Sequence, residues 1–374
     1  MENITLKTDN NAPQNAPHDS FQDTLYNAPH SEELYESPEY ARTSLAASIS
    51  LGMEPGLFAR GAGCGCLNIL LHYAKGCAAR CGYCGLAADR KSESKGSFIR
   101  VRWPVYSLES ILEKLKDEAR PFKRVCVSMV TRPRAMDDCV TVIEAFADRV
   151  GLPISALVCP TIMDGEADFL RLKRAGADRV GIAIDVATAP LFEALRGPGV
   201  KGPHRWERYL RALDEAVTVF GPYNAGVHLI VGLGETEEEM ARFIDRCYKK
   251  GALTHLFSFF PEPGSLMENH PRPSIESYRR IQLARHLINE SIRESADFTF
   301  TESGEIADFG IDISPYIQSG VPFMTSGCPG ADGRMACNRP YSNERPSEPI
   351  RNYHFIPDAD DIENIKSQVI IKTR

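Results

Sequence analysis

From residue 65 onward the chain alternates short, nearly continuous apolar runs with segments whose apolar residues recur at helical spacing. Parallel strands that are buried on both faces have such continuous apolar sequences. Runs that alternate with amphipathic helices are typical of βα units, whose strands lie parallel in one sheet. Eight runs are predicted as strands, over residues 67–73, 124–130, 154–160, 178–185, 225–233, 255–260, 297–301 and 322–327.

These eight βα units predict an α/β fold of the (β/α)8 TIM-type barrel class, because about 260 residues is the usual length of that barrel. Helices are predicted between the runs, with clear apolar stripes over residues 108–115 and 206–220. A doubly wound open sheet is the alternative fold. In a barrel the chemistry takes place on the loops after the carboxyl ends of the strands. Residues that follow each run are therefore candidate site residues.

The chain of 374 residues divides into four predicted segments. Residues 1–40 are rich in Asn, Pro, Asp and Glu and poor in aliphatic side chains, which is typical of a disordered tail. Residues 41–64 form an N-terminal extension, and residues 65–327 form the barrel. Residues 328–374 are rich in proline and are predicted to form a loop-rich cap over the barrel, with a short helix near residues 360–366.

Composition excludes several classes of protein. Hydrophobic residues make up 43% of the chain and charged residues 25%, as in a folded enzyme. No apolar run approaches the ~20 residues that span a membrane. A net charge of −7 differs from the strongly positive charge of typical nucleic-acid-binding proteins. For these two reasons, neither a membrane nor a nucleic acid is an expected partner. Eleven cysteines without a signal-peptide pattern predict a reducing, cytoplasmic location, where clustered thiols usually bind metal.

Three cysteines follow the first run within eight residues: Cys77, Cys81 and Cys84, in C-x3-C-x2-C spacing. Three thiolates can bind three irons of a [4Fe–4S] cluster, whereas ferredoxin clusters use four cysteines. The fourth iron then has no protein ligand and can bind a small molecule. A zinc site or simple packing of the thiols is the alternative, although structural zinc takes four closed ligands.

This spacing, with Tyr83 before the third cysteine, resembles the hallmark of the radical S-adenosylmethionine (SAM) superfamily. The resemblance implies a SAM-binding [4Fe–4S] cluster on Cys77, Cys81 and Cys84. It also implies that SAM is cleaved to methionine and a 5′-deoxyadenosyl radical, which abstracts hydrogen from a C–H bond. The protein would orient the cofactor and exclude water from the radical. The likeness extends over residues 65–327 and looks closest to the biotin synthase branch.

Further residues match SAM contacts of that branch. Asp185, at the end of the fourth run, matches a carboxylate that accepts the ribose hydroxyls, and Ile230 matches an adenine contact. Gly232 lies in a Val-Gly-Leu-Gly-Glu-Thr stretch that resembles the same branch, and Tyr83 is assigned to the same cofactor site. The alternatives are a helix N-cap before Ala187 for Asp185 and a tight turn for Gly232.

Two more cysteines, Cys328 and Cys337, stand among glycines and prolines after the eighth run. Glycine lets the backbone fold tightly and proline stiffens it, as a ligand loop requires. Because this segment leaves the eighth strand, we expect it on the same rim as Cys77 and predict an auxiliary iron–sulfur cluster there. Cys66 is predicted as a further ligand, with Cys64 as an alternative, although both enter the first strand at the opposite end. A zinc clip, a disulfide or unrelated thiols are the other possibilities.

Cys126 and Cys159 match two of the three cysteines that hold the sulfur-donating cluster of biotin synthase. The third cysteine falls at Gly226, and the arginine ligand falls near Thr299. A complete cluster of that type is therefore not expected. Cys126 is a further candidate ligand of the auxiliary cluster, and both cysteines are alternatively small buried hydrophobic residues.

From about residue 40 the chain most resembles the biotin-synthase-like subunits of the two-component lipoyl synthases. The resemblance implies a radical SAM sulfurtransferase that works with a second such component and inserts sulfur into an octanoyl chain. That chain is linked to a lysine of a lipoyl carrier domain or glycine cleavage H-type protein. The auxiliary cluster would be the sacrificial sulfur source, and a ferredoxin or flavodoxin would donate electrons. The segments that carry the resemblance are residues 42–47, 52–60, 66–71, 83–86 and 337–346.

Two other functions are consistent with the same residues. A biotin-synthase-like radical enzyme would act on a free small molecule without a sulfur-donating cluster. A non-catalytic iron–sulfur or zinc scaffold would support a partner protein. The identity of the product separates the two enzymes, and formation of 5′-deoxyadenosine separates either enzyme from the scaffold.

Overall fold

The computed structural model of the protein describes residues 35–90, 97–98, 100–116, 120–341 and 348–371. Its central feature is one sheet of eight strands. In spatial order the strands are β10 (Ala252–Ser258), β9 (Ala225–Val231), β8 (Ala177–Asp185), β7 (Ile154–Val158), β6 (Arg124–Ser128), β2 (Cys66–Leu71), β1 (Tyr40–Thr43) and β5 (Val105–Ser107).

The six strands from β10 to β2 are parallel, whereas β1 and β5 are antiparallel to their neighbours. These six parallel strands correspond to the first six predicted runs, so those strand predictions are confirmed. In the described part of the chain the pairings end at β10 and β5, and no pairing joins these two edges. The structure is therefore an α/β fold with a parallel sheet, and it does not show the predicted closed barrel of eight parallel strands.

The seventh predicted strand is wrong. Residues 297–301 contain only the two-residue strand β11 (Thr299–Phe300), which pairs with β12 (Ile306–Asp308) in a separate hairpin. The hairpin closes locally, because the Thr301 amide donates a hydrogen bond to the Glu305 carbonyl at 2.9 Å. Local pairing thus removes this segment from the main sheet.

The eighth predicted strand is also wrong. Residues 322–327 begin in the 3-10 helix η6 (Val321–Phe323), and Pro322 has no amide hydrogen to donate to a strand ladder. The Ser326 hydroxyl instead accepts a hydrogen bond from the amide of Leu256 in β10 at 3.0 Å. This segment therefore contacts β10 through a side chain and not through backbone pairing.

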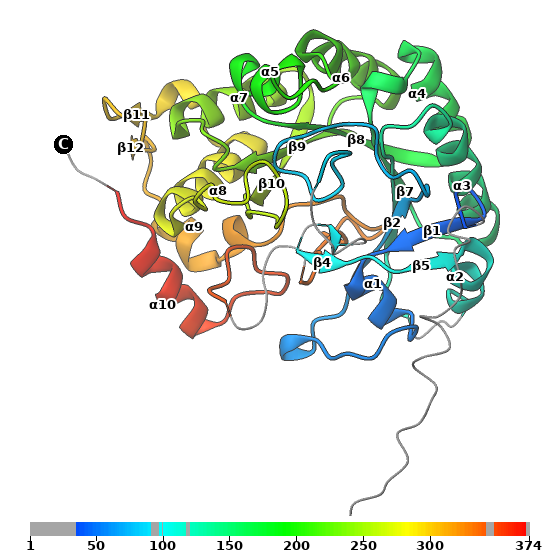
Figure 1. Ribbon diagram of the computed structural model, residues 1–374. Helices are drawn as coiled ribbons and strands as arrows, with labels where there is room; N and C mark the ends of the chain where they lie inside the picture. Colours follow the sequence, from blue (N-terminus) through cyan, green and yellow to red (C-terminus); the bar gives the residue numbers. More distant parts are fainter. Residues whose placement is uncertain (1–34, 91–96, 99, 117–119, 342–347, 372–374) are drawn as a thin grey trace, which may run out of the picture.

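Helices surround the sheet on its outer side in an arc (Figure 1). The predicted helical segments at 108–115, 206–220 and 360–366 are all helical. None of the helices in the described ranges is both long and apolar enough to cross a membrane. The helices are α1 (Leu45–Ser50), α2 (Leu108–Lys114), α3 (Ala135–Arg149), α4 (Gly165–Arg174), α5 (Ala189–Leu195), α6 (Trp206–Phe220), α7 (Glu237–Lys249), α8 (Ile275–Asn289), α9 (Ser314–Ser319) and α10 (Ala359–Gln368), and two further short strands are β3 (Ser97–Phe98) and β4 (Val101–Arg102).

The predicted N-terminal extension contributes to the sheet. Its strand β1 pairs with β2, and α1 follows β1 with Ser44 as its N-cap. Of the predicted tail, residues 1–34 lie outside the described residues, and Tyr40 is already the first residue of β1. The extension therefore adds a strand to the sheet between β2, the first parallel strand, and the edge strand β5.

The segment after residue 327 lies against the amino ends of the strands. The Asn338 side chain accepts a hydrogen bond from the Gly65 amide at 2.9 Å and donates one to the Gly63 carbonyl at 2.8 Å. Arg124, the first residue of β6, donates through Nε to the carbonyl of Pro329. The predicted position on the rim of the three-cysteine loop is therefore wrong, because this segment does not leave an eighth parallel strand.

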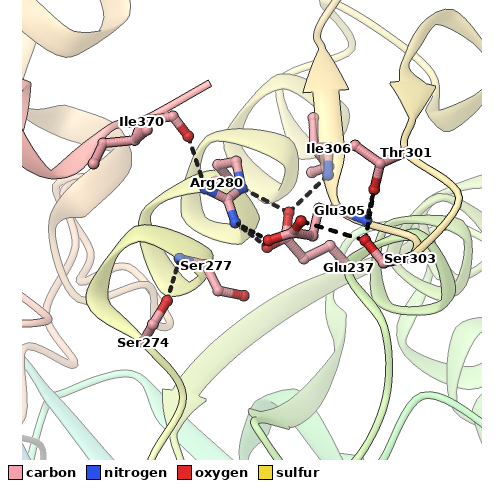
Figure 2. Close-up of polar contacts among 9 residues, drawn as sticks. All are labelled: Glu237, Ser274, Ser277, Arg280, Thr301, Ser303, Glu305, Ile306 and Ile370. Carbon is pink, nitrogen blue, oxygen red and sulfur yellow. Dashed lines mark hydrogen bonds and ion pairs between the residues drawn. The ribbon is translucent and has the colours of Figure 1, made fainter. Parts of the chain in front are cut away.

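A buried ion pair ties the outer elements together near the C-terminus (Figure 2). Arg280 on α8 donates to both carboxylate oxygens of Glu237 on α7, at 2.8 and 2.6 Å. Glu237 also accepts from the amide of Ile306 in β12 at 2.8 Å, and Arg280 donates to the carbonyl of Ile370 at 2.7 Å. The side chains of Arg280 and Glu237 are only 3% and 6% exposed.

Arg280→Ala is expected to lower the free energy of unfolding by about 3–5 kcal/mol, because it leaves the buried Glu237 carboxylate without its partner. Arg242→Ala is the matched control, since it removes an exposed pair with Glu238 on α7. The control should cost less than about 1 kcal/mol. Urea denaturation measures both values, and equal losses would show that burial does not set the strength of the Arg280 pair.

Gly65→Ala is expected to displace the C-terminal segment, because a Cβ at Gly65 would lie 2.5 Å from the carbonyl oxygen of Ala336. The loss of stability should be about 1–3 kcal/mol. Cys337, which follows Ala336, should react several-fold faster with a thiol reagent in the metal-free protein. Gly151→Ala is the control, since no atom lies within 4 Å of its added Cβ. Unchanged labelling of Cys337 in Gly65→Ala would contradict this packing.

Candidate active site

A cavity of about 260 Å³ lies inside the curved sheet and is lined by residues from both ends of the parallel strands. Along most of each strand alternate residues face it, as the pleat requires, whereas at the carboxyl ends of β7 and β10 two successive residues line it. The six runs are therefore not uniformly apolar on this face. The residues of the strands that line the cavity are Cys66, Asn68 and Leu70 of β2, Arg124, Cys126 and Ser128 of β6, Ser155, Leu157 and Val158 of β7, Ala183 and Asp185 of β8, His228 and Ile230 of β9, and His255, Phe257 and Ser258 of β10.

The three-cysteine loop follows β2 at the carboxyl end of the strands, and all three of its cysteines line the cavity. Backbone amides already point at two of the sulfurs. The amides of Ala79 and Thr131 each donate to Cys77 Sγ at 3.4 Å, and the amide of Leu86 donates to Cys84 Sγ at 3.4 Å. Hydrogen bonds to cysteine sulfur stabilise the thiolate and set the potential of a bound cluster. The loop thus presents sulfurs together with the donors that an iron–sulfur cluster uses.

Burial governs the protonation of this loop. It raises the pKa of Cys81 to about 11, although the guanidinium of Arg196 opposes the shift, and it raises the pKa of Cys84 well above its usual range. Both groups are therefore neutral thiols near pH 7 in the metal-free chain. Iron binding must displace these protons, which couples assembly of a cluster to pH.

Tyr83 and Asp185 are joined directly beside this loop. Tyr83 Oη donates to Asp185 Oδ2 at 2.5 Å, and Arg196 Nη1 lies 3.4 Å from the same oxygen. Asp185 has a φ of 68°, in the left-handed region that Asp adopts more readily than most residues. Helix α5 begins after Thr188, whose side chain caps it, so the alternative reading of Asp185 as an N-cap is wrong.

The other two predicted SAM contacts lie in different surroundings. Ile230 lines the cavity together with Tyr83 and Asp185. Gly232 does not line it; its amide donates to Glu235 at 2.6 Å in a turn, and a Cβ there would lie 2.6 Å from Pro273. The structure therefore brings three of the four predicted residues to one cavity. Their contacts with SAM stay predictions.

A second group of cysteines lines the same cavity at the amino end of the strands. Cys66 is the first residue of β2. Cys126 lies on β6, opposite Asn68 of β2, and the C-terminal segment contributes Cys328 and Cys337. The amide of Cys337 donates to the carbonyl of Cys328 at 3.2 Å, which holds these two residues together. The side-chain amide of Asn68 lies 3.6 Å from the Cys66 sulfur and 4.0 Å from the Cys337 sulfur.

Positive charge surrounds this second group. A hydrogen bond from the Cys66 thiol lowers the pKa of Cys337, with a further contribution from Arg339, and the same bond raises the pKa of Cys66. Arg124 is 1% exposed and pairs with Asp178 through two bonds of 2.6 and 2.8 Å. These guanidinium groups favour the anionic form of the sulfurs.

In the sequence analysis, the position of Cys66 at the amino end of the first strand was an argument against Cys66 as a ligand of the auxiliary cluster. The structure reverses that argument, because Cys328 and Cys337 lie at the same end. Cys64 is buried, its thiol donates to the carbonyl of Cys66 at 3.1 Å, and it does not line the cavity. Cys159 lines the cavity at the other end, 3.2 Å from the hydroxyl of Thr131.

Within the described ranges, no three His, Cys, Asp or Glu side chains converge closely enough to hold a single metal ion. A [4Fe–4S] cluster makes a different demand, because each thiolate binds a different iron. The cavity offers soft sulfur ligands at both ends, with hydrogen-bond donors and guanidinium groups beside them. In ligand chemistry and surroundings, the three cysteines of the loop fit a [4Fe–4S] cluster.

Several polar residues of this cavity were not identified from the sequence, among them Asn68, Arg124, Arg196, His228 and His255. Asn68, Arg124, His228 and His255 lie in runs that were predicted as buried strands. Each of them is two positions along its strand from another residue that faces the cavity. That two-residue spacing was the available signal. Burial lowers the pKa of His228 to about 3 and that of His255 well below its usual range, so both imidazoles are neutral near pH 7.

Several solved structures are similar to this chain. Methylornithine synthase (PylB) is 17% identical, with a TM-score of 0.48 over 66% of this chain and 67% of that chain. HydG, a maturase of the [FeFe]-hydrogenase, is 15% identical, with a TM-score of 0.47 over 65% of this chain and 57% of that chain. The radical SAM methyltransferase TsrM from Kitasatospora setae is 15% identical, with a TM-score of 0.38 over 69% of this chain and 51% of that chain.

The central part of the chain matches a known family of protein domains. Residues 71–247 match the family model described as the Radical SAM superfamily. The match contains the three-cysteine loop, Asp185 and Ile230. No curated protein matches the chain. The centre of the chain therefore matches the radical SAM superfamily domain, which occurs in enzymes that use a [4Fe–4S] cluster and SAM.

Proposed function

We propose that the protein is a radical SAM sulfurtransferase and one component of a two-protein lipoyl synthase. The observation that carries this proposal is a single cavity with the three cysteines of the loop, together with Cys159, at its carboxyl end and four cysteines at its amino end. A substrate chain in the cavity would lie between the two groups. That placement suits a reaction that activates a carbon at one side and delivers sulfur from the other.

Cys77, Cys81 and Cys84 would hold the SAM-binding cluster, and Tyr83 and Asp185 would orient SAM beside it. The Tyr83 hydroxyl fixes the Asp185 carboxylate at the end of β8 before any cofactor binds. A carboxylate held in this way can accept hydrogen bonds from a ribose diol. The buried guanidinium of Arg196 balances its charge.

Cys66, Cys126, Cys328 and Cys337 would hold the auxiliary cluster. Cys126 would supply the ligand that the sequence left open; its place in the lining of the cavity, with the other three cysteines, supports this assignment. Four cysteines are the usual ligand set of a [4Fe–4S] cluster. When the clusters are bound, the first supplies the electron that cleaves SAM to methionine and a 5′-deoxyadenosyl radical, and the second supplies sulfur to the carbon that loses hydrogen.

Radical chemistry is needed because no side chain near pH 7 can remove a proton from an alkane carbon by general base catalysis. The middle of the cavity suits such a carbon chain. Leu70, Met129, Leu157, Val158 and Phe257 line it, and its histidines are neutral. An octanoyl chain would gain apolar burial there, while the surrounding side chains exclude water.

The proposed partners follow from this reaction. The octanoyl chain would arrive on a lysine of a lipoyl carrier domain or glycine cleavage H-type protein. A second radical SAM component would insert the other sulfur, and a ferredoxin or flavodoxin would supply electrons.

Cys77→Ala, Cys81→Ala and Cys84→Ala are each expected to abolish formation of 5′-deoxyadenosine from SAM under reducing, anaerobic conditions. Each removes one of three ligands, and no other cysteine on the loop can replace it. Cys247→Ala, a buried change on α7 outside the cavity, is the control and should keep the activity. If wild-type protein forms no 5′-deoxyadenosine, the radical function is wrong.

Cys328→Ala/Cys337→Ala is expected to keep formation of 5′-deoxyadenosine but to lose sulfur insertion into an octanoyl-lysine peptide, followed by mass spectrometry. Iron content should fall from about eight to about four per chain, because one of two [4Fe–4S] clusters is lost. Sulfur insertion that persists in this variant would overturn the auxiliary site. A free small-molecule product in wild-type protein would instead favour a biotin-synthase-like enzyme.

A further inference from the structure

Basic side chains surround the outer side of the three-cysteine loop. We call this group the basic patch and define it by Lys75, Arg80, Arg132, Lys201 and Arg205. Four of these side chains are exposed, and Arg132 is half-buried. The patch stands out because the chain as a whole carries a net charge of −7.

Hydrogen bonds from arginine side chains to backbone carbonyls link the patch across three loops. Arg132 donates to the carbonyls of Lys75 and of the residue after it. Arg80 donates to the carbonyl of Lys201 at 3.4 Å, and Arg205 donates to the carbonyl of the residue after Lys201 at 3.1 Å. The loops after β2 and β6 and the loop before α6 thus share one positive surface. Asp89, 4.0 Å from Arg80, offsets part of this charge.

The loop has two sides. Cys77, Ala79 and Cys81 line the cavity, whereas Ala78 and Arg80 between them are exposed. No member of the basic patch lines the cavity. The patch therefore approaches the cysteine ligands from outside and does not approach the space for SAM and substrate.

This position fits one class of partner better than another. A protein that delivers a substrate chain must dock where the cavity can be entered. A protein that delivers an electron needs only a short distance to the cluster, because electron transfer slows steeply with distance. Opposite charges on two protein surfaces steer their association and raise the on-rate.

We propose that the basic patch is the docking surface for an acidic electron carrier of the ferredoxin type. The inference rests on the proposed SAM-binding cluster of the same loop. The carrier is oxidised by one electron, and the cluster on Cys77, Cys81 and Cys84 is reduced by that electron.

Lys75→Glu/Lys201→Glu reverses two exposed charges of the patch and changes no cysteine. Lys114→Glu/Lys366→Glu is the matched control, with the same change in net charge on exposed residues of α2 and α10. The dissociation constant of an oxidised, acidic ferredoxin from the cluster-loaded protein is measured by calorimetry. The patch variant should bind about tenfold more weakly than wild type at 50 mM salt, and the control should bind within about twofold of wild type.

A second measurement compares two reductants in the formation of 5′-deoxyadenosine. With reduced ferredoxin the patch variant should be slower than wild type, and with the cationic methyl viologen radical it should match wild type. Equal binding of ferredoxin by both double variants would overturn the docking surface. Equal loss with both reductants would also overturn it, because the defect would then lie in the cluster. Wild-type protein that is inactive even with methyl viologen would contradict the proposed function instead, while the binding measurement still reports on the patch.

Discussion

The guanidinium of Arg124 holds the amino end of the cavity together. It is almost fully buried, it pairs with Asp178 of β8, and it donates to the hydroxyl of Ser155 on β7 at 2.8 Å and to the carbonyl of Pro329. One side chain of β6 thus fixes two neighbouring strands and the C-terminal segment. An unpaired guanidinium at this depth would be costly, so these contacts form as a set. Cys328, next to Pro329, is placed beside the sheet as a result.

The C-terminal segment is shaped locally before Arg124 and Asn338 anchor it. Pro329 pairs with Met335 in an isolated bridge, and Gly333 between them has a φ of 74°. The Asp332 carboxylate accepts a hydrogen bond from the amide of Arg334 at 3.0 Å, which supports the same turn. This tight reversal brings Cys328 and Cys337 to one place. The sheet then adds Cys66 and Cys126 from adjacent strands.

The cavity has consequences for how its centres are assembled. Desolvation raises the pKa of Cys81, Cys84 and Cys126, which disfavours the thiolates that iron requires. The two ends differ in how they compensate. Backbone amides donate to sulfur at the three-cysteine loop, whereas the amide of Asn68 and guanidinium groups lie beside the sulfurs at the amino end. The histidines between the two ends are neutral, so the middle of the cavity carries no imidazolium charge.

Local patterns in the sequence were sufficient to predict several elements of the structure. Hydrophobic runs predicted the six parallel strands, apolar stripes predicted α2 and α6, and the spacing of Cys77, Cys81 and Cys84 marked the three-cysteine loop as a candidate metal site. Each of these signals is carried by residues that are near neighbours in the chain. The sequence did not exclude the two strands that were wrongly predicted at 297–301 and 322–327. A short apolar run has the same pattern in a hairpin, in a coil and in a large sheet.

Contacts between residues that are distant in the sequence follow from the three-dimensional packing alone. Cys66 and Cys337 are 271 positions apart in the printed sequence, and nothing in either segment shows that both lie at the amino end of the strands. That meeting depends on the bonds of Asn338 to Gly63 and Gly65 and on the side chain of Arg124. Such bonds join segments that are far apart in the sequence, so their partners are fixed by packing in space and not by spacing along the chain.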